Sequence, residues 1–260
     1  MRILQRITIG AFLLVLLAFV GTKIYTSQAV DRVPPTITCD SDIIEVQVGA
    51  SDRALLKGIT ATDDRDGDVT DQIMIKGVSQ LIGADTAKVT YIAFDSSNNM
   101  ATCQRTVRYT DYERPRFSLS KPLTFPLGTS IKLLDLLTAN DVLDGDISDS
   151  IRVTTQNVDT GTAGTYSVTV QATNSLGDVE SLPLKVVIRS GAASFVPLTL
   201  SEYILYLDVG DSYRAGNYVI SPSAPSEVEI DSHVDTHTPG VYDVSYTYQN
   251  FTVYQTVIVR

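Results

Sequence analysis

Short stretches in which apolar and polar residues alternate recur along most of this chain. Clear examples are IEVQV at residues 44–48, VTYIA at residues 89–93 and YSVTVQA at residues 166–172. Because successive side chains of a strand point to opposite faces, this period of two predicts half-buried β-strands. Turn-rich segments separate these stretches at short intervals, which is typical of β-sandwiches. The pattern therefore predicts an all-β protein.

The beginning of the chain departs from this pattern. Residues 7–22 read ITIGAFLLVLLAFVGT and carry no charge, with Arg6 before them and Lys23 after them. A helix needs about 20 mainly apolar residues to cross a membrane, and residues 3–24 supply them if the flanking basic side chains reach the interface. Positive charges ahead of the span predict a single-pass anchor with its N-terminus in the cytoplasm and the later residues extracellular. The alternative is a signal peptide cleaved near Ser27-Gln28-Ala29.

An internal repeat divides the rest of the chain. TATDDRDGDVTD at residues 60–71 returns as TANDVLDGDISD at residues 138–149, and VDTHTPGVYDV at residues 234–244 resembles VDTGTAGTYSV at residues 158–168. A repeat at a nearly fixed period indicates an array of similar modules. After a cytoplasmic stub and anchor at residues 1–30, we expect modules at residues 31–111, 112–190 and 191–260.

Two motifs carry a resemblance to known families. The first module opens with PPTITC at residues 34–39 and closes with AFDSSNNMATC at residues 93–103. This pair resembles the HYR (hyalin repeat) module, although Asn98 stands where that family has Gly. The TATDDRDGDVTD stretch is similar to a bacterial Ig-like domain of surface proteins and some crystal toxins. Over residues 33 to about 190, the resemblance implies tandem Ig-like β-sandwich modules in a bacterial cell envelope, and it implies no catalysis.

The chain has two cysteines, Cys39 and Cys103, in the expected first and last strands of the first module. In an exported protein, two cysteines placed in this way are expected to form a disulfide. The second and third modules have no cysteine and must depend on their apolar cores.

The repeated acidic stretch has two interpretations. An Asp-Gly turn, in which the side chains bind local backbone N–H groups, explains it without a ligand. A cluster of carboxylates also suits Ca²⁺, which takes six to eight oxygen ligands. An EF-hand does not fit, because its register places Ile73 where a bidentate Glu is required. The candidate ligands for Ca²⁺, the one cofactor considered, are Asp63, Asp64, Asp66, Asp68, Asp71, Asp144, Asp146 and Asp149.

Tyrosine is concentrated in the third module. Tyr242, Tyr246 and Tyr248 share one face of an expected strand, which favours core and cross-strand packing. The alternative is a binding surface, because tyrosine is enriched at interfaces. The candidate surface residues are Tyr203, Tyr206, Tyr213 and Tyr218.

Charge and motif content narrow the function. A formal net charge of -10 argues against nucleic acid as a partner, since nucleic acids attract basic patches. The chain has two histidines and none of the common catalytic motifs, so we expect a protein that is not an enzyme. We expect instead a membrane-anchored stalk that binds or adheres to an unknown protein or glycan. The alternatives are a structural subunit of a larger envelope assembly and an accessory carbohydrate-binding surface protein.

Overall fold

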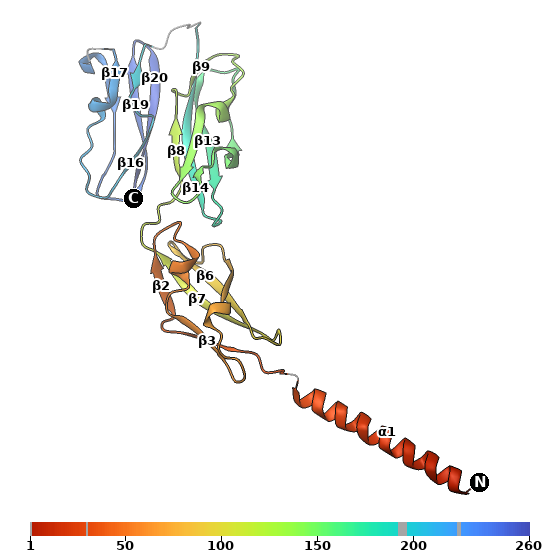
Figure 1. The fold of residues 1–260 in the computed structure, drawn as a ribbon. Coiled ribbons are helices and arrows are strands. Elements are labelled where there is room, and N and C mark those ends of the chain that lie inside the picture. The colour runs from red at the N-terminus through yellow and green to blue at the C-terminus, as the bar shows by residue number, and fades with distance from the viewer. Residues whose placement is uncertain (1, 30, 192–196, 223–224) are drawn as a thin grey trace. The chain divides into compact units, whose positions relative to one another are not determined.

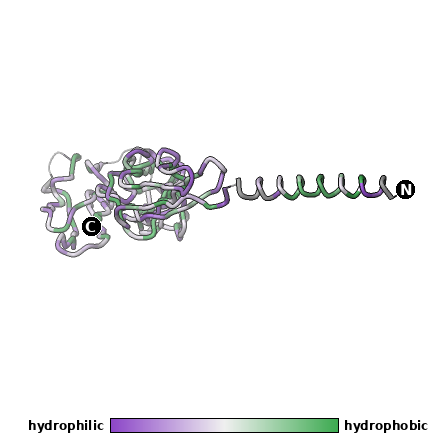
Figure 2. Tube along the Cα trace, turned by 60° about the horizontal axis from the view of Figure 1, so that its bottom comes forward, coloured by the Kyte–Doolittle hydropathy of each residue, from purple (hydrophilic) through white to green (hydrophobic). Residues whose placement is uncertain are grey.

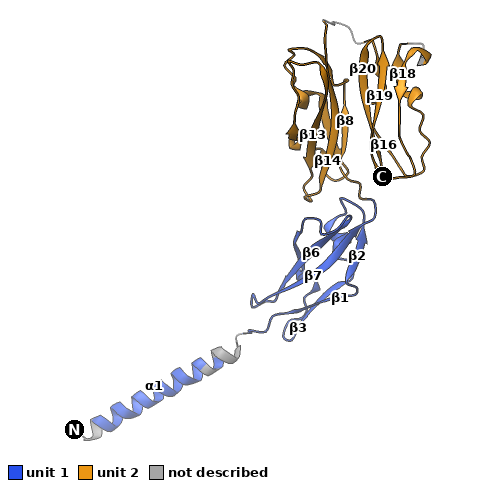
Figure 3. Cartoon of the chain, turned by 180° about the vertical axis from the view of Figure 1, so that it is seen from behind, with its two compact units in different colours: residues 1–111 blue, residues 112–260 orange. Residues whose placement is uncertain are grey.

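The computed structural model describes residues 2–29, 31–191, 197–222 and 225–260. The chain divides into two compact units, Met1–Asp111 and Tyr112–Arg260 (Figure 3). Apart from one long helix and several single-turn helices, the described residues form β-strands in six small sheets (Figure 1). The prediction of an all-β architecture is confirmed.

Helix α1 (Arg2–Ala29) contains the apolar run near the N-terminus. Its stretch Gln5–Lys23 is 19 residues long with a mean hydropathy of 1.8, and none of it is buried within the protein. Apolar residues fill the middle of this helix (Figure 2). The stretch is long and apolar enough to cross a membrane, and a signal sequence would meet the same two criteria.

The first module, which follows α1, is a sandwich of two sheets. One sheet has the order β1-β3-β4, and the other has the order β2-β7-β6-β5 with β2 parallel to β7. Single-turn helices α2 (Asp52–Leu55) and η1 (Thr70–Gln72) lie in its connections. The strands are β1 (Thr36–Cys39), β2 (Ile43–Val46), β3 (Ile59–Asp63), β4 (Gly67–Asp68), β5 (Met74–Val78), β6 (Thr86–Phe94) and β7 (Met100–Tyr109).

The second module repeats this topology. Its sheets have the orders β11-β10-β8 and β12-β13-β14-β9, with β9 parallel to β14. Helical turns η2 (Leu133–Leu136) and η3 (Ser148–Ser150) flank β10 and β11. The strands are β8 (Arg116–Leu119), β9 (Thr124–Pro126), β10 (Leu137–Asp141), β11 (Gly145–Asp146), β12 (Arg152–Gln156), β13 (Gly164–Thr173) and β14 (Val179–Arg189).

The third module is a smaller sandwich. A two-stranded sheet, β15-β17, faces a four-stranded sheet of order β16-β20-β19-β18, in which β16 runs parallel to β20. Helical turns η4 (Ala215–Tyr218) and η5 (Pro225–Glu227) lie in its connections. The strands are β15 (Thr199–Leu200), β16 (Ile204–Leu207), β17 (Val219–Ser221), β18 (Glu229–Asp231), β19 (Gly240–Tyr248) and β20 (Phe251–Val259).

The second and third modules pack on each other within one unit. Ile204 and Ile258 of the third module are buried in the apolar core of the second. The backbone N–H of Phe117 donates a hydrogen bond to the Tyr206 hydroxyl at 2.8 Å, and the Thr124 hydroxyl donates to the carbonyl of Thr252 at 2.6 Å. A seam with buried apolar groups and paired polar groups resists independent motion of its two sides. The two modules therefore form one body.

Candidate functional site

The alternation of strand residues turns two aspartates of the first module inward. In β3 the buried residues are Ile59, Ala61 and Asp63, and each alternate residue is exposed. In β6 the buried positions include Tyr91 and Ala93, and the next position of the same period, just beyond the strand, is Asp95. Apolar residues normally occupy such positions, so an acid there requires a specific explanation.

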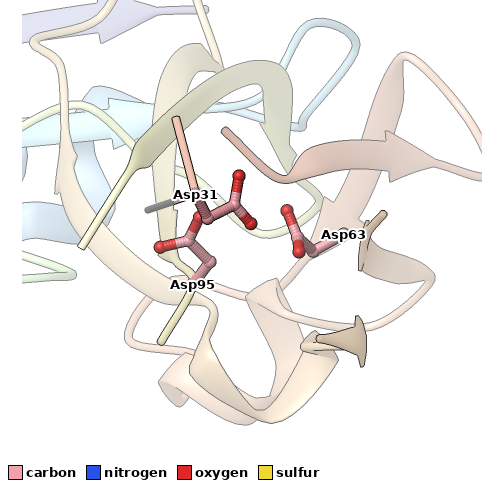
Figure 4. Close-up of side chains that lie close together, drawn as sticks. All are labelled: Asp31, Asp63 and Asp95. Carbon is pink, nitrogen blue, oxygen red and sulfur yellow. The ribbon is translucent and has the colours of Figure 1, made fainter. Parts of the chain in front are cut away.

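A third aspartate joins these two. Asp31 precedes β1, and one carboxylate oxygen from each of Asp31, Asp63 and Asp95 lies within 4.8 Å of the others (Figure 4). The three residues are only 6%, 8% and 6% exposed, respectively. They come from three segments that are far apart in the sequence and that the tertiary fold brings together.

Local hydrogen bonds fix the orientation of each carboxylate. Asp63 accepts the backbone N–H groups of Arg65 and Asp66 on Oδ1, both at 2.9 Å, while its Oδ2 is buried without a hydrogen-bond partner. Asp95 accepts the backbone N–H of Asn99 at 2.7 Å on Oδ1 and its side-chain amide at 2.6 Å on Oδ2. The Asp31 Oδ1 atom accepts the backbone N–H of Val33 at 2.9 Å.

The cluster concentrates negative charge where little water reaches. Hydrogen bonds from the backbone of Asp66 and Arg65 lower the pKa of Asp63, which favours its ionised form at neutral pH. Ionised carboxylates that lie this close together repel one another. Arg65, whose side chain is 46% exposed, places Nε 3.8 Å from Asp31 Oδ2. One partly solvated guanidinium offsets part of the charge of three carboxylates.

Two of these three positions have counterparts in the second module. Asp141 ends β10 as Asp63 ends β3, and Asn174 follows β13 as Asp95 follows β6. The Asn174 amide donates to Asp141 Oδ2 at 3.0 Å and to the Tyr112 hydroxyl at 2.8 Å. The Tyr112 hydroxyl in turn donates to Asp178 Oδ2 at 2.8 Å. Direct hydrogen bonds therefore link the polar groups at this place.

The remaining predicted ligands in the acidic repeat serve the turns. Asp66 accepts hydrogen bonds from the backbone N–H and the hydroxyl of Ser96, at 2.6 and 2.8 Å, and Asp144 accepts the matching pair from Ser175 at 2.6 and 2.7 Å. The Thr70 hydroxyl and backbone N–H lower the pKa of Asp68. Ser148 lowers the pKa of the exposed Asp146 in the same way. The residues Asp64, Asp71 and Asp149 are exposed at the surface.

Of the eight predicted ligands, Asp63 alone is in the described carboxylate cluster. Asp31 and Asp95 are not among the eight predicted ligands. Extending the period of two from β6 by one step would have indicated Asp95. The sequence gives no comparable signal for Asp31, because it lies before the first strand.

The two cysteines lie next to each other as expected, but they are not bonded. Cys39 in β1 and Cys103 in β7 belong to different sheets, and their Sγ atoms are 3.5 Å apart as free thiols. A disulfide requires an S–S distance of about 2.05 Å. Burial and the hydrogen bond with Cys103 raise the pKa of Cys39 to about 11. The pairing is as predicted, and the predicted disulfide itself is absent from this structure.

The four tyrosines proposed as a binding surface lie mainly in packing positions. Tyr203 is buried, so it cannot present a surface, and its burial contributes apolar area to the core. Tyr206 lies in the seam between modules, with the guanidinium carbons of Arg116 and Arg260 at 5.4 and 4.6 Å from its ring centre. The rings of Tyr213 and Tyr218 stack at 5.7 Å.

A hydrogen-bond network explains why tyrosine is required in this core. The hydroxyls of Tyr213 and Tyr246 both donate to the buried Gln255 side-chain carbonyl, at 2.8 and 2.9 Å. The Gln255 amide in turn donates to the carbonyl of Glu202 at 2.9 Å. Buried polar groups that satisfy one another in this way specify a single packing arrangement. Core packing, the first interpretation of the tyrosine pattern, is what the structure shows for Tyr246.

Family comparisons agree with this modular reading. Residues 30–109 match the HYR domain, and residues 117–186 match the bacterial surface protein, Ig-like domain. In the stretch that matches the HYR domain, Asn98 adopts a φ of 64°, and Gly177 of the second module adopts 76° at the matching turn. Asn tolerates this left-handed conformation better than most residues, which explains how it replaces the family's Gly.

Two curated relatives share part of their length with this chain. The pesticidal crystal protein Cry22Aa of Bacillus thuringiensis is 27% identical over 220 residues, which is 80% of this chain and 30% of the relative. An uncharacterized 81.3 kDa protein of Acholeplasma phage L2 is 27% identical over 182 residues, which is 62% of this chain and 22% of the relative. The chain spans less than a third of the length of either relative.

Among solved structures, the CBM51-2 domain in complex with GlcNAc and INT domains from Clostridium perfringens ZmpB matches with a TM-score of 0.25. That match is 21% identical and covers 56% of this chain and 26% of the other. A TM-score this low does not establish a common fold.

Proposed function

We propose that this chain is a non-catalytic binding or adhesion protein of a bacterial cell surface, anchored in the membrane by α1. The observation that carries the proposal is the order of its parts. An exposed apolar helix is followed directly by an HYR module and a bacterial surface Ig-like module. Modules of this kind supply stable surfaces without catalytic groups, and function on such folds resides in what their faces contact.

The charge distribution supports an outward orientation of the modules. Arg2 and Arg6 precede the apolar stretch, and positive residues are retained on the cytoplasmic side of a membrane span. The second unit supports a presenting role, since its two modules share a core and form one broad body. A partner meeting that unit would contact a surface that loses little entropy on binding, because it is already rigid.

The topology test uses the full chain fused at its C-terminus to alkaline phosphatase, which is active only outside the cytoplasm. We expect phosphatase activity on intact cells and retention of the chain in carbonate-washed membranes. The matched control replaces Leu14 by Arg, which places a charge in the middle of the apolar stretch at a cost of about 3 kcal/mol. Release of the unmodified chain from the membrane, or a phosphatase that stays inactive, would contradict the anchored orientation.

The adhesion test displays the same full chain on a heterologous bacterium. We expect these cells to adhere to a lawn of bacteria more strongly than cells carrying the Leu14→Arg chain. Equal adherence of the two strains, with the unmodified chain confirmed at the surface, would favour a structural role within an envelope assembly.

A further inference from the structure

We propose that Asp31, Asp63 and Asp95 bind one Ca²⁺ ion at the edge of the first module. Hard divalent cations prefer carboxylate oxygens, and extracellular modules commonly use them to stiffen loops. The three carboxylates lie close together, and each residue is more than nine-tenths buried (Figure 4). This site differs from the turn aspartates that the sequence motif emphasises, and it does not depend on the adhesion role proposed above.

The buried Oδ2 atom of Asp63 is the observation that points to a ligand. It has no hydrogen-bond partner, although Oδ1 of the same residue accepts two backbone N–H groups. A charged oxygen without a partner is costly away from water, and native structures rarely contain one without a specific reason. A cation held between the three side chains supplies the missing partner.

The spacing of the oxygens suits Ca²⁺. The three nearest carboxylate oxygens all lie within 4.8 Å of one another. Oxygens on opposite sides of a Ca²⁺ ion are separated by about 4.6–5.2 Å, which is twice the usual metal–oxygen distance. Separations within this limit can be spanned by one Ca²⁺ ion.

The coordination number also fits. Three carboxylates supply about three to six oxygens, and water completes the six to eight that Ca²⁺ takes. Asp95 Oδ1 accepts the backbone N–H groups of Ser97 and Asn99, while Oδ2 accepts only the Asn99 side-chain amide and keeps a second lone pair for the ion. The hydrogen bonds from backbone N–H groups hold the carboxylates in place, so little ordering is left to be done when the ion binds.

The second module acts as a natural control for this site. Asn174 stands where the first module has Asp95, and its amide donates to Asp141 Oδ2 and to the Tyr112 hydroxyl. A charged side chain of the first module is here replaced by a hydrogen-bond donor. The acidic set is therefore a property of the first module and not a requirement of the Ig-like turn.

Bound Ca²⁺ would tie together three parts of the first module. Asp31 comes two residues after the last residue of α1, Asp63 ends β3, and Asp95 begins the turn between β6 and β7. The ion would fix the residue that enters the module to the sandwich. Its proposed role is to stiffen the chain where it leaves the apolar helix.

The first measurement is calorimetric titration of Ca²⁺ into the full chain in detergent. We expect one ion per chain, with a Kd in the range of about 10⁻⁴–10⁻³ M that is typical of extracellular modules. Asp95→Asn, which copies Asn174, should weaken binding at least about tenfold, because the ion loses one of three charged ligands. Asp64→Asn is the matched control. It removes the same charge from an exposed position beside Asp63 and should leave binding within about twofold.

The second measurement is differential scanning calorimetry of the same proteins. Ca²⁺ at ten times its Kd should raise the unfolding temperature of the first unit by roughly 5–10 °C. Without Ca²⁺, Asp95→Asn should unfold at a higher temperature than the unmodified chain, because it relieves repulsion between carboxylates. The unmodified chain should therefore unfold at the higher temperature with Ca²⁺ and at the lower temperature without it. A purely structural role for Asp95 would not reverse the order of the two unfolding temperatures.

Several results would overturn the proposal. The first is the absence of binding heat at a Ca²⁺ concentration about ten times the weakest expected Kd. The second is a loss of Ca²⁺ binding in Asp64→Asn as large as that in Asp95→Asn. The third is full Ca²⁺ binding in Asp95→Asn. If Asp95→Asn does not fold, Asp31→Asn gives the same two readouts. The side-chain oxygen of Asn can still accept the hydrogen bond that the Val33 N–H donates to Asp31 Oδ1, so the local turn is retained. Full binding in that variant would equally exclude the site.

Discussion

The first and second modules share a topology and differ in the side chains that meet at corresponding turns. In the first module Asp31, Asp63 and Asp95 lie close together, and Asp63 Oδ2 is buried without a hydrogen-bond partner. In the second module Asp141 and Asn174 are hydrogen-bonded to each other. A sandwich fold therefore fixes where side chains meet, while the residue types decide whether their polar atoms satisfy one another.

The two units also differ in how they gain stability. The first unit has two small apolar clusters and a pair of adjacent cysteines. The second unit has no cysteine and instead joins two modules through a shared core. A small sandwich buries a smaller fraction of its surface, so a covalent link or a bound ion contributes proportionally more to it.

The largest effect is expected from the cysteine pair. Oxidation of Cys39 and Cys103 requires the sulfur atoms to close from 3.5 Å, which small rotations of the side chains can supply. Closing this loop should stabilise the first unit by about 4 kcal/mol on the chain-entropy account. Thiol titration of air-oxidised and reduced protein, followed by denaturant unfolding of each, measures both the bond and its contribution.

Replacing both cysteines by Ser is the control for this prediction. The double variant should unfold like reduced protein, and the second unit should respond to neither change. Two titratable thiols that persist after prolonged oxidation would show that the pair stays reduced.

The next largest effect is expected when Asn174 is replaced by Asp, the residue type that the first module has at the matching position, Asp95. Asn174→Asp removes the amide that donates to Asp141 and Tyr112 and leaves two carboxylates facing each other. We expect a loss of about 2–3 kcal/mol from the unfolding free energy of the second unit. Hydrogen exchange measured peptide by peptide on the full chain separates this unit from the first.

Asn174→Ser tests whether charge is the cause. It shortens the side chain without adding a carboxylate, so it should destabilise the second unit less than Asn174→Asp. If the two variants are equally destabilised, the lost amide contacts would account for the whole effect and repulsion would be unimportant.

A smaller effect is expected from an ion pair that the first module lacks. Asp178 accepts hydrogen bonds from Arg114 Nη2 at 3.2 Å and from the Tyr112 hydroxyl at 2.8 Å, and the residue at the matching turn of the first module is Asn99. Burial by itself would raise the pKa of Asp178, but the bonds and charge of Arg114 and the bond from Tyr112 outweigh it and lower this pKa.

A lowered pKa means that Asp178 stabilises the folded second unit above its unfolded pKa of about 3.9, and that this contribution disappears as the pH falls through the folded pKa. Asp178→Asn should therefore cost about 1–2 kcal/mol at pH 7, discounted because the Arg114 side chain is half exposed. The difference from the unmodified chain should shrink below about pH 4. A difference that does not change with pH would show that packing, not charge, is responsible.

The smallest effect tests the seam within the second unit. Tyr206→Phe retains the ring between Arg116 and Arg260 and removes the hydroxyl that accepts the Phe117 N–H. We expect a loss of about 1 kcal/mol, with the second and third modules still exchanging their amides together. Separate exchange behaviour of the two modules in the unmodified chain would contradict a single body.

Several features of this protein followed from the sequence. The period of two identified strands such as β6 and β13, since a half-buried strand must alternate whatever lies around it. The resemblance to the two module families is confirmed by the matches at residues 30–109 and 117–186. The adjacency of Cys39 and Cys103 was also foreseen, because their places in the motif put them on neighbouring strands.

Other features depended on the tertiary structure. The acidic motif drew attention to Asp66 and Asp68, which bind local turn groups. The carboxylates that converge are separated by more than thirty residues and meet through the pairing of strands and the packing of sheets, which no local pattern encodes. The seam between the second and third modules was missed for the same reason. Local periodicity determines which face of a strand is buried, and only the packed fold determines what that face meets.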